Sequence, residues 1–345
     1  MMYDSIFFRL DLNKFPEALE KAQKLVDYEL KSYKNSKTNQ YENKLFGFRV
    51  KLTHKILWFS GSIHKFYKGN NLDSMSFDDL MDALKTLEDN FDIPLKCFEV
   101  HRLDLAANIQ VSETPINYIK QFFKYDKYKW VGYINGGGRY QNKSSKKVVC
   151  FYDKIEEIKD KKLTSSLSHN IQEYGNVLRF ELRWGKRLSK VFGTLSLESL
   201  LSEKIYESAV NLWAVEYFKI NKLQISKDKP VLSSTSDLEK IALAEKITRE
   251  STGEISNYID GLRKLHNMPL DKNNSKSILK KVKASLELYY AYNDSFEKFL
   301  IDELDKKIIE AKDSALASLK TKDNKRHDIQ LSINEFCQLL KKLAV

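Results

Sequence analysis

The segment KVVCFYDKIEE, residues 147–157, joins a strand pattern to the charged start of a helix. Side chains alternate across a strand, so Val148, Cys150 and Tyr152 share one face. After Tyr152 the spacing of apolar residues becomes helical, in DKIEEIKDKK. The strand therefore carries a tyrosine hydroxyl to a junction that is rich in lysine and carboxylates, and we expect the fold to be organised around it.

Tyr152 is the candidate nucleophile of this junction. A tyrosine hydroxyl titrates near pH ~10, so attack on phosphorus at neutral pH needs a base, a metal or a nearby cation. The local candidates are Asp153, Lys154, Glu156 and Glu157. An ordinary strand-to-helix junction can show the same pattern, so the assignment depends on partners elsewhere in the chain.

A second strand is predicted for CFEVHRLDLAANIQV, residues 97–111. Its alternation places Arg102, Asp104 and Asn108 on one face and His101 on the other. Charge inside an apolar strand is costly unless it is paired. One interpretation is a structural ion pair at a sheet edge. The other is a metal-binding carboxylate, Asp104, with Arg102 positioning a phosphate or a neighbouring acid.

A third strand is predicted for NVLRFELR, residues 176–183. Its apolar residues face one way, whereas Arg179, Glu181 and Arg183 face the other. Such a row is typical of a solvent-facing ladder. It could equally complete a metal and phosphate site together with Asp104.

Basic residues near these strands are candidates for contact with a nucleic-acid backbone. The segment SGSIHKFYKGNN, residues 60–71, reads as a loop whose small residues and lysines suit phosphate, although an ordinary solvated loop has the same composition. The segment WGKRLSKVFG, residues 184–193, resembles a basic rim. The predicted DNA-binding residues are Lys65, Lys68, Arg102, Arg179, Arg183, Lys186 and Arg187.

The composition favours an anionic partner. The 345 residues include 58 Lys and Arg against 47 Asp and Glu, a formal net charge of +11, and nucleic acid is the first expectation for such a protein. Charge alone is weak evidence, because many lysine-rich proteins are basic without this role. No window approaches a membrane-spanning length, and the dispersed cysteines indicate a reducing compartment. We therefore expect a cytoplasmic protein with no membrane partner.

Two domains are expected. Residues 1–224 predict an α+β catalytic domain with an antiparallel sheet of about five strands and packed helices. The residues from 195 to 220 read as one long amphipathic helix. Residues 225–236 form the best linker, and residues 237–345 predict an all-α domain with basic faces. Those faces could be solvated, or could hold duplex DNA or a partner.

Four segments in order resemble the gene II replication proteins of filamentous phages, and more distantly the Rep_trans plasmid initiators. The segments are SGSIHKFYKGNN, HRLDLAAN, VVCFYDKIEE and VLRFELRWGKRLSKVFG, spanning roughly residues 57–195. In the family pattern Arg-Ile/Leu-Asp precedes Tyr-x-Lys-x-x-Glu, which precedes Arg-hydrophobic-Glu. No single triplet is specific, so the order and spacing carry the resemblance.

The resemblance implies a Rep/HUH-like nuclease core that initiates rolling-circle replication. Such an enzyme nicks one DNA strand at an origin, and its tyrosine keeps the new 5′ phosphate covalently. By position, Tyr152 would be the nucleophile and Lys154 would stabilise the phosphorane or the tyrosinate. Asp104 and Glu181 would bind Mg²⁺ or Mn²⁺. Glu157 is left as a third metal ligand, an acid or base, or a plain helix residue.

The sequence departs from the wider HUH nucleases because their His-hydrophobe-His metal motif is absent. Three rivals stay open: a conjugative relaxase, a non-catalytic basic protein that binds an origin or RNA, and a hydrolytic nuclease that uses Asp104, Glu181 and water. Docking of a host helicase on residues 237–345 is also left open. The tyrosine mechanism requires Asp104 and Glu181 to come within metal-sharing distance of the Tyr152 hydroxyl, from strands that lie next to its own.

Overall fold

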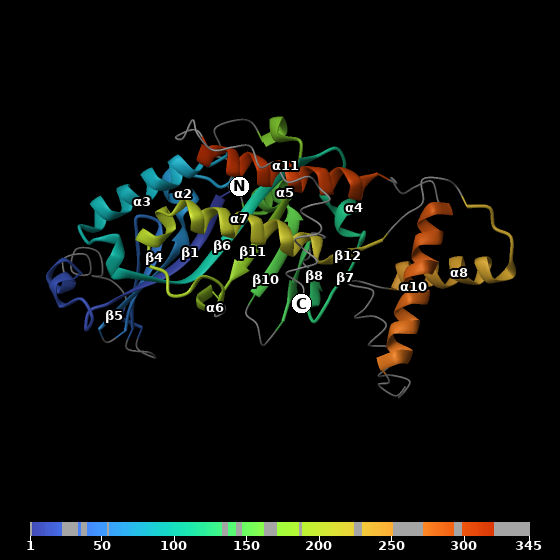
Figure 1. Ribbon diagram of the computed structural model, residues 1–345, viewed down its shortest axis with the longest axis horizontal. Coiled ribbons are helices and arrows are strands. Elements are labelled where there is room, and N and C mark those ends of the chain that lie inside the picture. Colours follow the sequence, from blue (N-terminus) through green and yellow to red (C-terminus); the bar gives the residue numbers. More distant parts are fainter. Residues whose placement is uncertain are drawn as a thin grey trace.

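The protein is an α+β structure built on a wide antiparallel sheet (Figure 1). The computed structural model describes residues 2–22, 34–35, 40–53, 55–132, 137–142, 147–161, 171–185, 188–223, 230–250, 272–292 and 299–320. Its strand order is β2-β3-β4-β5-β1-β6-β11-β10-β9-β8, ten strands in all. The predicted fold class is therefore confirmed, although the sheet is wider than the expected five strands.

The central strands are the longest, and they carry the candidate residues. They are β1 (Met2–Asp11), β6 (Phe98–Val111), β11 (Asn176–Trp184) and β10 (Lys147–Asp153). The sheet extends beyond β1 through β5 (Ile56–Ser62), β4 (Phe48–Thr53), β3 (Gln40–Leu45) and β2 (Lys34–Asn35). It extends beyond β10 through β9 (Gly138–Gln141) and β8 (Lys129–Gly132), while β7 (Phe122–Tyr125) pairs separately with β12 (Ile220–Lys222).

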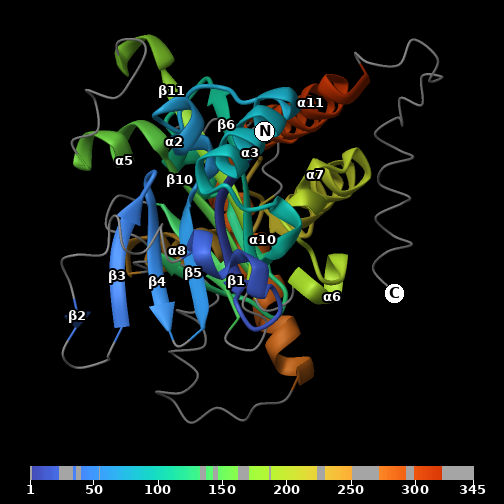
Figure 2. The same cartoon turned by 90° about the vertical axis from the view of Figure 1, so that its left-hand side faces the viewer.

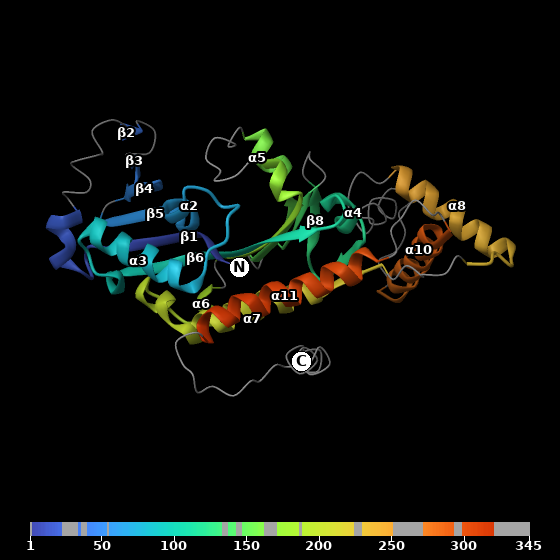
Figure 3. The same ribbon diagram turned by 90° about the horizontal axis from the view of Figure 1, so that it is seen from above.

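One face of the sheet is covered by helices and forms the main core. Alternate apolar residues such as Phe8, Leu105 and Phe180 are fully buried there. The covering helices include α3 (Phe77–Phe91), α7 (Glu203–Phe218) and α11 (Leu300–Lys320). Figure 3 shows α7 and α11 running along the same side of the sheet.

The helix α3 starts as its sequence predicts. The Ser76 side chain accepts a hydrogen bond from the Asp79 backbone N–H, and the Asp79 carboxylate accepts one from the Ser76 N–H. This capping box satisfies two backbone donors that the first turn leaves unpaired. The helix then buries Leu80, Leu84 and Leu87 against the core, so its apolar stripe fixes how it lies on the sheet.

The segment from 195 to 220 is not one continuous helix. A short 3₁₀ turn, η5 (Glu198–Leu201), comes first, and α7 begins only at Glu203. Ser202 lies between them with an extended backbone, and this break separates the two helical pieces. The other short elements are η1 (Pro16–Ala18), η2 (Leu95–Cys97), α4 (Pro115–Ile119), η4 (Ile171–Tyr174) and α6 (Leu188–Phe192).

The C-terminal helices pack in two places. The helices α8 (Thr235–Glu250) and α10 (Lys272–Tyr292) pack on one another beyond one end of the sheet (Figure 1). They share a small core with Phe123 and Leu223. Helix α11 instead buries Leu304 and Ile308 in the main core. The domain boundary between residues 224 and 237 stays a prediction. Helix α11, which follows this boundary in the sequence, packs with the sheet.

The helix α2 (Ile63–Lys68) follows β5 directly and packs against α3, with Ile63 in the main core. The short helix α5 (Lys154–Asp160) follows β10. Figure 3 shows α5 on the opposite side of the sheet from α7 and α11. The segment 60–71, expected to be a loop, is therefore the end of β5 followed by a helix. The Ser62 hydroxyl caps that helix by accepting the Lys65 N–H at 3.1 Å.

In the part of the chain that the structure describes, no helix combines the length and the apolar character needed to cross a membrane.

Candidate active site

Three adjacent strands bring Tyr152, Glu181 and Asp104 to one face of the sheet. Strand β11 lies between β10 and β6. Its register sets Arg179 opposite Tyr152 on β10, and Arg183 opposite Asp104 on β6. Because side chains alternate, Glu181 lies on the same face as its neighbours Arg179 and Arg183. All three residues therefore share a face, and Glu181 comes from the strand next to that of Tyr152, but β11 separates the strand of Asp104 from β10.

The Tyr152 hydroxyl points toward Glu181. The hydroxyl oxygen lies 3.5 Å from Glu181 Oε2, which is long for a hydrogen bond between oxygens. Burial raises the pKa of Tyr152 well above its usual value, the positive charge of Arg179 opposes this rise, and Glu181 adds to it. Tyr152 therefore keeps its proton in the resting protein.

Two arginines hold the predicted metal ligands. Arg102 donates from Nε and Nη2 to the two Asp104 oxygens at 2.8 and 2.5 Å. Arg183 donates to the two Glu181 oxygens at 2.9 and 3.0 Å, and its Nε lies 4.0 Å from Asp104 Oδ2. Burial raises the pKa of Asp104 to about 7, with a further contribution from Glu181 and opposition from Arg102. The two carboxylates therefore lie close enough to repel one another.

This pair of carboxylates fits a hard divalent cation in its donor chemistry. Mg²⁺ and Mn²⁺ prefer carboxylate oxygens, and a cation would relieve the repulsion between Asp104 and Glu181. Among the described residues, no group of three or more His, Cys, Asp and Glu side chains is arranged to hold a metal. The Arg102 side chain is 42% exposed whereas Asp104 is fully buried. Arg102 therefore covers Asp104 from the solvent side.

Arg179 is buried beneath Tyr152, which corrects its predicted contact with a DNA backbone. Its side chain has no exposed surface, its Nη2 lies 2.6 Å from Asp4 Oδ2, and its Nη1 donates to Asn108 Oδ1 at 2.8 Å. A fully buried guanidinium with these partners is out of reach of a nucleic acid. Its charge acts instead on Tyr152, the residue directly opposite on β10.

Asp4 is a site residue that the sequence did not reveal. It lies in β1 where the pairing with β6 is irregular, between Tyr3 and Ile6. The Ser62 hydroxyl donates to Asp4 Oδ1 at 2.9 Å. Although burial raises the pKa of Asp4, Arg179 and the Ser62 hydrogen bond lower it to about 2. The only local signal was an acid inside an apolar strand.

Lys154 and Glu157 form a second pair at the start of α5, in which Lys154 is buried and Glu157 is partly exposed. Lys154 is 1% exposed, pairs with Glu157 Oε2 at 2.5 Å and donates to Asn71 Oδ1 at 2.9 Å. Burial, aided by Arg179, lowers the pKa of Lys154 to about 8. Burial also raises the pKa of Glu157, but Lys154 and Lys161 outweigh it and leave that pKa below its usual value. Asn71 was expected only as part of a phosphate loop.

The other two acids near Tyr152 have structural roles. The Asp153 carboxylate caps α5 by accepting the N–H groups of Ile155 and Glu156, at 2.9 and 3.0 Å. Glu156 pairs with Lys159 on the surface of the same helix. Of the four candidates beside Tyr152, only Lys154 and Glu157 join the buried polar cluster.

The remaining predicted DNA contacts are scattered. Lys65 is exposed on α2, and Lys68 beside it pairs with Asp79 of α3 at 2.8 Å. Arg102 and Arg183 are partly exposed but hold carboxylates. Lys186 and Arg187 lie outside the residues that the structure describes. Contact of these residues with DNA stays a prediction.

His101 lies on the same face as Asp104, which corrects the alternation expected from the sequence. Phe7 pairs with Arg102 while Phe8 pairs with Val100, so β6 has one extra residue at this point. Such a bulge shifts the alternation of a strand by one residue. The His101 ring consequently packs edge-on against Phe7 on this face.

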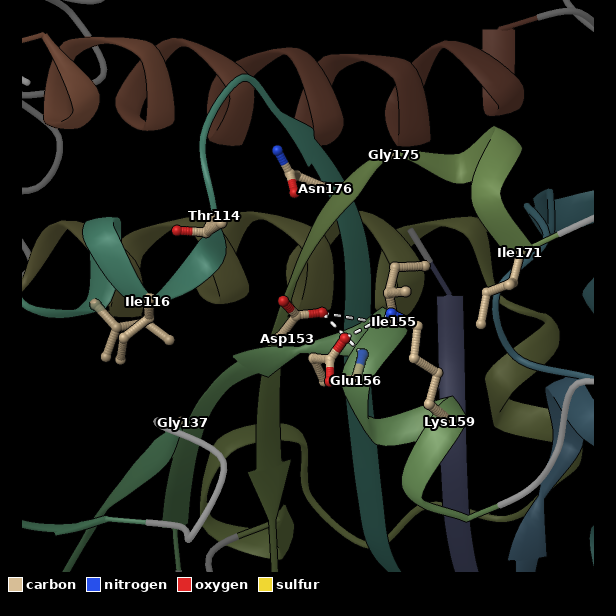
Figure 4. Close-up of a pocket in the computed structure, with 11 residues that line it drawn as sticks. Thr114, Ile116, Gly137, Asp153, Ile155, Glu156, Lys159, Ile171, Gly175 and Asn176 are labelled. Carbon is tan, nitrogen blue, oxygen red and sulfur yellow. Dashed lines mark hydrogen bonds and ion pairs between the residues drawn. The ribbon is translucent and has the colours of Figure 1, made fainter.

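A cavity of about 500 Å³ opens beside the end of β10 (Figure 4). It lies between α4 and the first turn of α5, with Gly137 and Asp153 in its wall. Asp153 and Glu156 line it, but Tyr152, Lys154, Glu157, the predicted metal ligands and the predicted DNA-binding residues do not. The polar cluster around Tyr152 is therefore separate from this cavity.

The sequence of the region that carries these strands matches a known family. The model of the N-terminal region of the phage gene II replication-associated protein matches residues 2–212. The chain belongs to this phage family. The matched span contains every strand of the ten-stranded sheet and ends inside α7. No curated protein was found to match the chain.

Membership in the gene II family confirms the resemblance found in the sequence. It identifies the chain as a phage replication protein of the initiator type, which acts on DNA. Both parts of the polar cluster, the Asp104–Glu181 side and the Asp4–Lys154 side, lie within the matched residues.

Proposed function

We propose that this member of the gene II family nicks and rejoins one DNA strand at a replication origin through a covalent 5′-phosphotyrosine. One observation carries the proposal: the Tyr152 hydroxyl lies 3.5 Å from Glu181 on the sheet face that also presents Asp104. Membership in a replication family supports DNA as the substrate. The bond energy retained in the phosphotyrosine then allows the strand to be closed again at the end of a replication cycle.

The reaction is a transesterification at phosphorus. Tyr152 Oη attacks the scissile phosphate, the bond from phosphorus to the 3′ oxygen breaks, and that oxygen leaves with a proton as a 3′ hydroxyl. The tyrosine proton passes to Glu181, the nearest carboxylate, which releases it to solvent, and the departing 3′ oxygen takes its proton from solvent. The 5′ phosphate stays on Tyr152, so the reverse attack by a 3′ hydroxyl restores the strand.

The charges around Tyr152 balance before substrate binds. Four cations, Arg102, Lys154, Arg179 and Arg183, are paired with four carboxylates, Asp104, Glu157, Asp4 and Glu181. A phosphate and an ionising tyrosine would add negative charge to this neutral cluster. Arg179 lies opposite Tyr152, and its positive charge favours the tyrosinate. Lys154, two residues along the chain from Tyr152, would stabilise the phosphorane.

The extra negative charge supports a divalent cation. Asp104 and Glu181 would hold Mg²⁺ or Mn²⁺, which would act as a Lewis acid on the phosphate. Binding requires Arg102 to release Asp104, and the exposure of Arg102 permits this. Arg102 would then be available to a phosphate oxygen. Removal of divalent cations with EDTA is expected to abolish nicking and to leave the fold intact.

The test uses a supercoiled plasmid that carries the origin of the element encoding this chain, incubated with the protein and Mn²⁺. A protein–DNA adduct that survives denaturation is expected for the wild type, and Tyr152→Phe should reduce it to background. Tyr67→Phe is the matched control, because the Tyr67 hydroxyl lies on α2 near Asp82 rather than at the cluster. It should form the adduct at the wild-type rate.

Two outcomes would contradict the proposal. Cleavage that persists in Tyr152→Phe would indicate hydrolysis by water with Asp104 and Glu181. Binding without cleavage, in the wild type with Mn²⁺, would indicate a protein that recognises the origin without cutting it.

A further inference from the structure

The sheet face that presents Asp104 and Tyr152 continues across β1, β5, β4 and β3. The pairing register connects Lys44 of β3 with Arg49, Ser60, Phe7 and finally Arg102 of β6. Residues paired directly across antiparallel strands point to the same face. Figure 2 shows β3, β4 and β5 lying side by side at this part of the sheet.

A second row runs beside the first. Lys51 of β4 pairs with Trp58 of β5, which pairs with Arg9 of β1, which pairs with Glu99 of β6. On β4, β5 and β1, each of these positions lies two residues from a member of the first row. Alternation in a strand therefore puts both rows on the same face.

The two rows meet in an aromatic cluster. The Phe7 and Trp58 rings stack, with centroids 5.0 Å apart and planes at 17°. His101 packs edge-on against Trp58 at 5.2 Å, and the Arg9 guanidinium lies 5.5 Å from the Trp58 ring centre. The β6 bulge brings His101 to this cluster. All four side chains are half-buried, so part of each remains open to solvent.

The contrast with the other face shows that this cluster is not core. Phe8, Phe48 and Phe59 point to the covered side of the same strands and are fully buried. An antiparallel sheet with one solvated face normally carries polar residues there. Rings on the solvated side are therefore available to a partner with flat apolar groups.

The cations beside the rings indicate the charge of that partner. Lys44 and Arg49 are exposed and Lys51 is partly exposed. Glu99 is engaged by Arg9 at 2.8 Å. The second row extends to Glu42 of β3, which pairs with Lys51, so the two rows contain two carboxylates, Glu99 and Glu42. Aromatic rings interleaved with cations bind single-stranded nucleic acid, because bases stack on the rings while phosphates meet the cations.

We propose that this strip, defined as Phe7, Arg9, Lys44, Arg49, Lys51, Trp58 and His101, binds unpaired nucleotides of the strand that enters the Tyr152 site. Neighbouring strands lie about 4.8 Å apart, so the face from β3 to β10 spans about 29 Å, on the order of five nucleotides. The Phe7–Arg102 pairing joins the strip to the Asp104 side of the site. The proposal rests on the proposed function for its substrate.

The test measures binding without cleavage. The full chain carrying Tyr152→Phe is titrated into a fluorescein-labelled oligothymidylate of about 20 nucleotides. Adding Trp58→Ala or Phe7→Ala is expected to weaken affinity about tenfold, because each removes a stacking ring. Phe299→Ala is the matched control, since Phe299 is a 57% exposed aromatic before α11, and it should leave affinity unchanged.

A second measurement, the salt dependence of affinity, tests the role of Lys44 and Arg49. The double variant Lys44→Ala and Arg49→Ala should lower the slope of log affinity against log salt by about 1.4, which corresponds to two phosphates on a single strand. Trp58→Phe keeps a ring and should retain most of the affinity. If Trp58→Phe retains affinity and Trp58→Ala keeps the wild-type melting temperature, the weaker binding of Trp58→Ala comes from lost stacking and not from misfolding.

The outcomes distinguish the strip from the nicking reaction. Unchanged affinity in both aromatic variants overturns the strip, whether or not the Tyr152-dependent adduct forms. Duplex DNA bound as tightly as the single strand, with no effect of Trp58→Ala, also overturns it. Weaker binding in the aromatic variants, in a protein that forms no adduct, supports the strip and overturns only the nicking proposal.

Discussion

The buried charges of Arg179 and Asp4, close to Tyr152, form an ion pair. Arg179 and Asp4 are both nearly inaccessible and lie 2.6 Å apart. Removing one member of such a pair leaves an uncompensated buried charge and typically costs several kcal/mol. Because the cost of burying both charges offsets much of their attraction, the intact pair contributes little net stability. It does fix a positive charge opposite Tyr152. This placement suits the proposed reaction, in which Tyr152 would become negatively charged.

His64 makes stability depend on pH. Its ring is fully buried, and neither ring nitrogen has a hydrogen-bond partner in the part of the chain described. Burial, aided by Arg179 and against the attraction of Asp4 and Asp73, lowers its pKa from 6.5 to about 4. The unfolded chain therefore binds more protons between these two values. The free energy of unfolding should rise with pH from about 4 to 6.5 and fall on acidification.

The variant His64→Met removes this titration while keeping an apolar side chain of similar size. We expect the wild type to lose up to about 3 kcal/mol relative to His64→Met between pH 6.5 and pH 4. Urea unfolding of both proteins across this range measures the difference. Parallel curves for the two proteins would contradict the assignment.

At the level of elements, the close packing of Gly137 on β10 positions Tyr152. A Cβ atom at residue 137 would lie 2.6 Å from Tyr152 Cβ and 2.8 Å from the Phe151 carbonyl oxygen. Both distances are shorter than van der Waals contact, and backbone atoms of β10 are among those affected. A larger residue must therefore displace the strand that carries Tyr152, the proposed nucleophile.

We expect Gly137→Ala to slow formation of the Tyr152 adduct by about tenfold or more, because small displacements of a nucleophile strongly reduce rate. The overpacking should also cost about 1–3 kcal/mol of stability. Gly132→Ala is the control, since the nearest atom to its Cβ is 3.9 Å away. Adduct kinetics and urea unfolding provide the measurements. A wild-type adduct rate in Gly137→Ala would show that Tyr152 does not depend on this contact.

Short elements were the least predictable from the sequence. The segment 60–71 contains Gly, Ser and Asn, which favour loops, yet Ser62 caps a helix there. The bulge at His101 was also missed, because an alternating pattern does not show where one strand has an extra residue relative to its partner. Both features depend on pairing with β1 and β5, which lie elsewhere in the chain.

For the whole molecule, α11 belongs to the same core as the sheet. Leu304 is fully buried with residues of α7 and β6, and the Glu303 carboxylate accepts the Ser112 hydroxyl at 2.6 Å. Residues after the family match therefore complete the core of the matched region. We expect α11 to unfold together with the sheet.

The variant Leu304→Ala should lower the free energy of unfolding of this shared core by about 2–5 kcal/mol. Leu243→Ala on α8 is the control, because Leu243 is an exposed leucine and should change stability by less than about 0.5 kcal/mol. Urea unfolding followed by aromatic fluorescence, which reports the sheet core, makes the comparison. An unchanged fluorescence transition in Leu304→Ala would show that α11 is not part of the cooperative unit.

The sequence by itself determined the strands of Asp104, Tyr152 and Glu181, and the family to which they belong. Alternation is a local property, so the shared face of Arg102, Asp104 and Asn108 could be predicted from their own strand, whereas the place of His101 could not. The tertiary structure decided the rest. The order β1-β6-β11-β10 brings Asp4 to Arg179 and buries that pair, and the register across β3 to β6 gathers the cations and rings beside the Tyr152 site. Such contacts join residues far apart in the chain, and no local pattern encodes them.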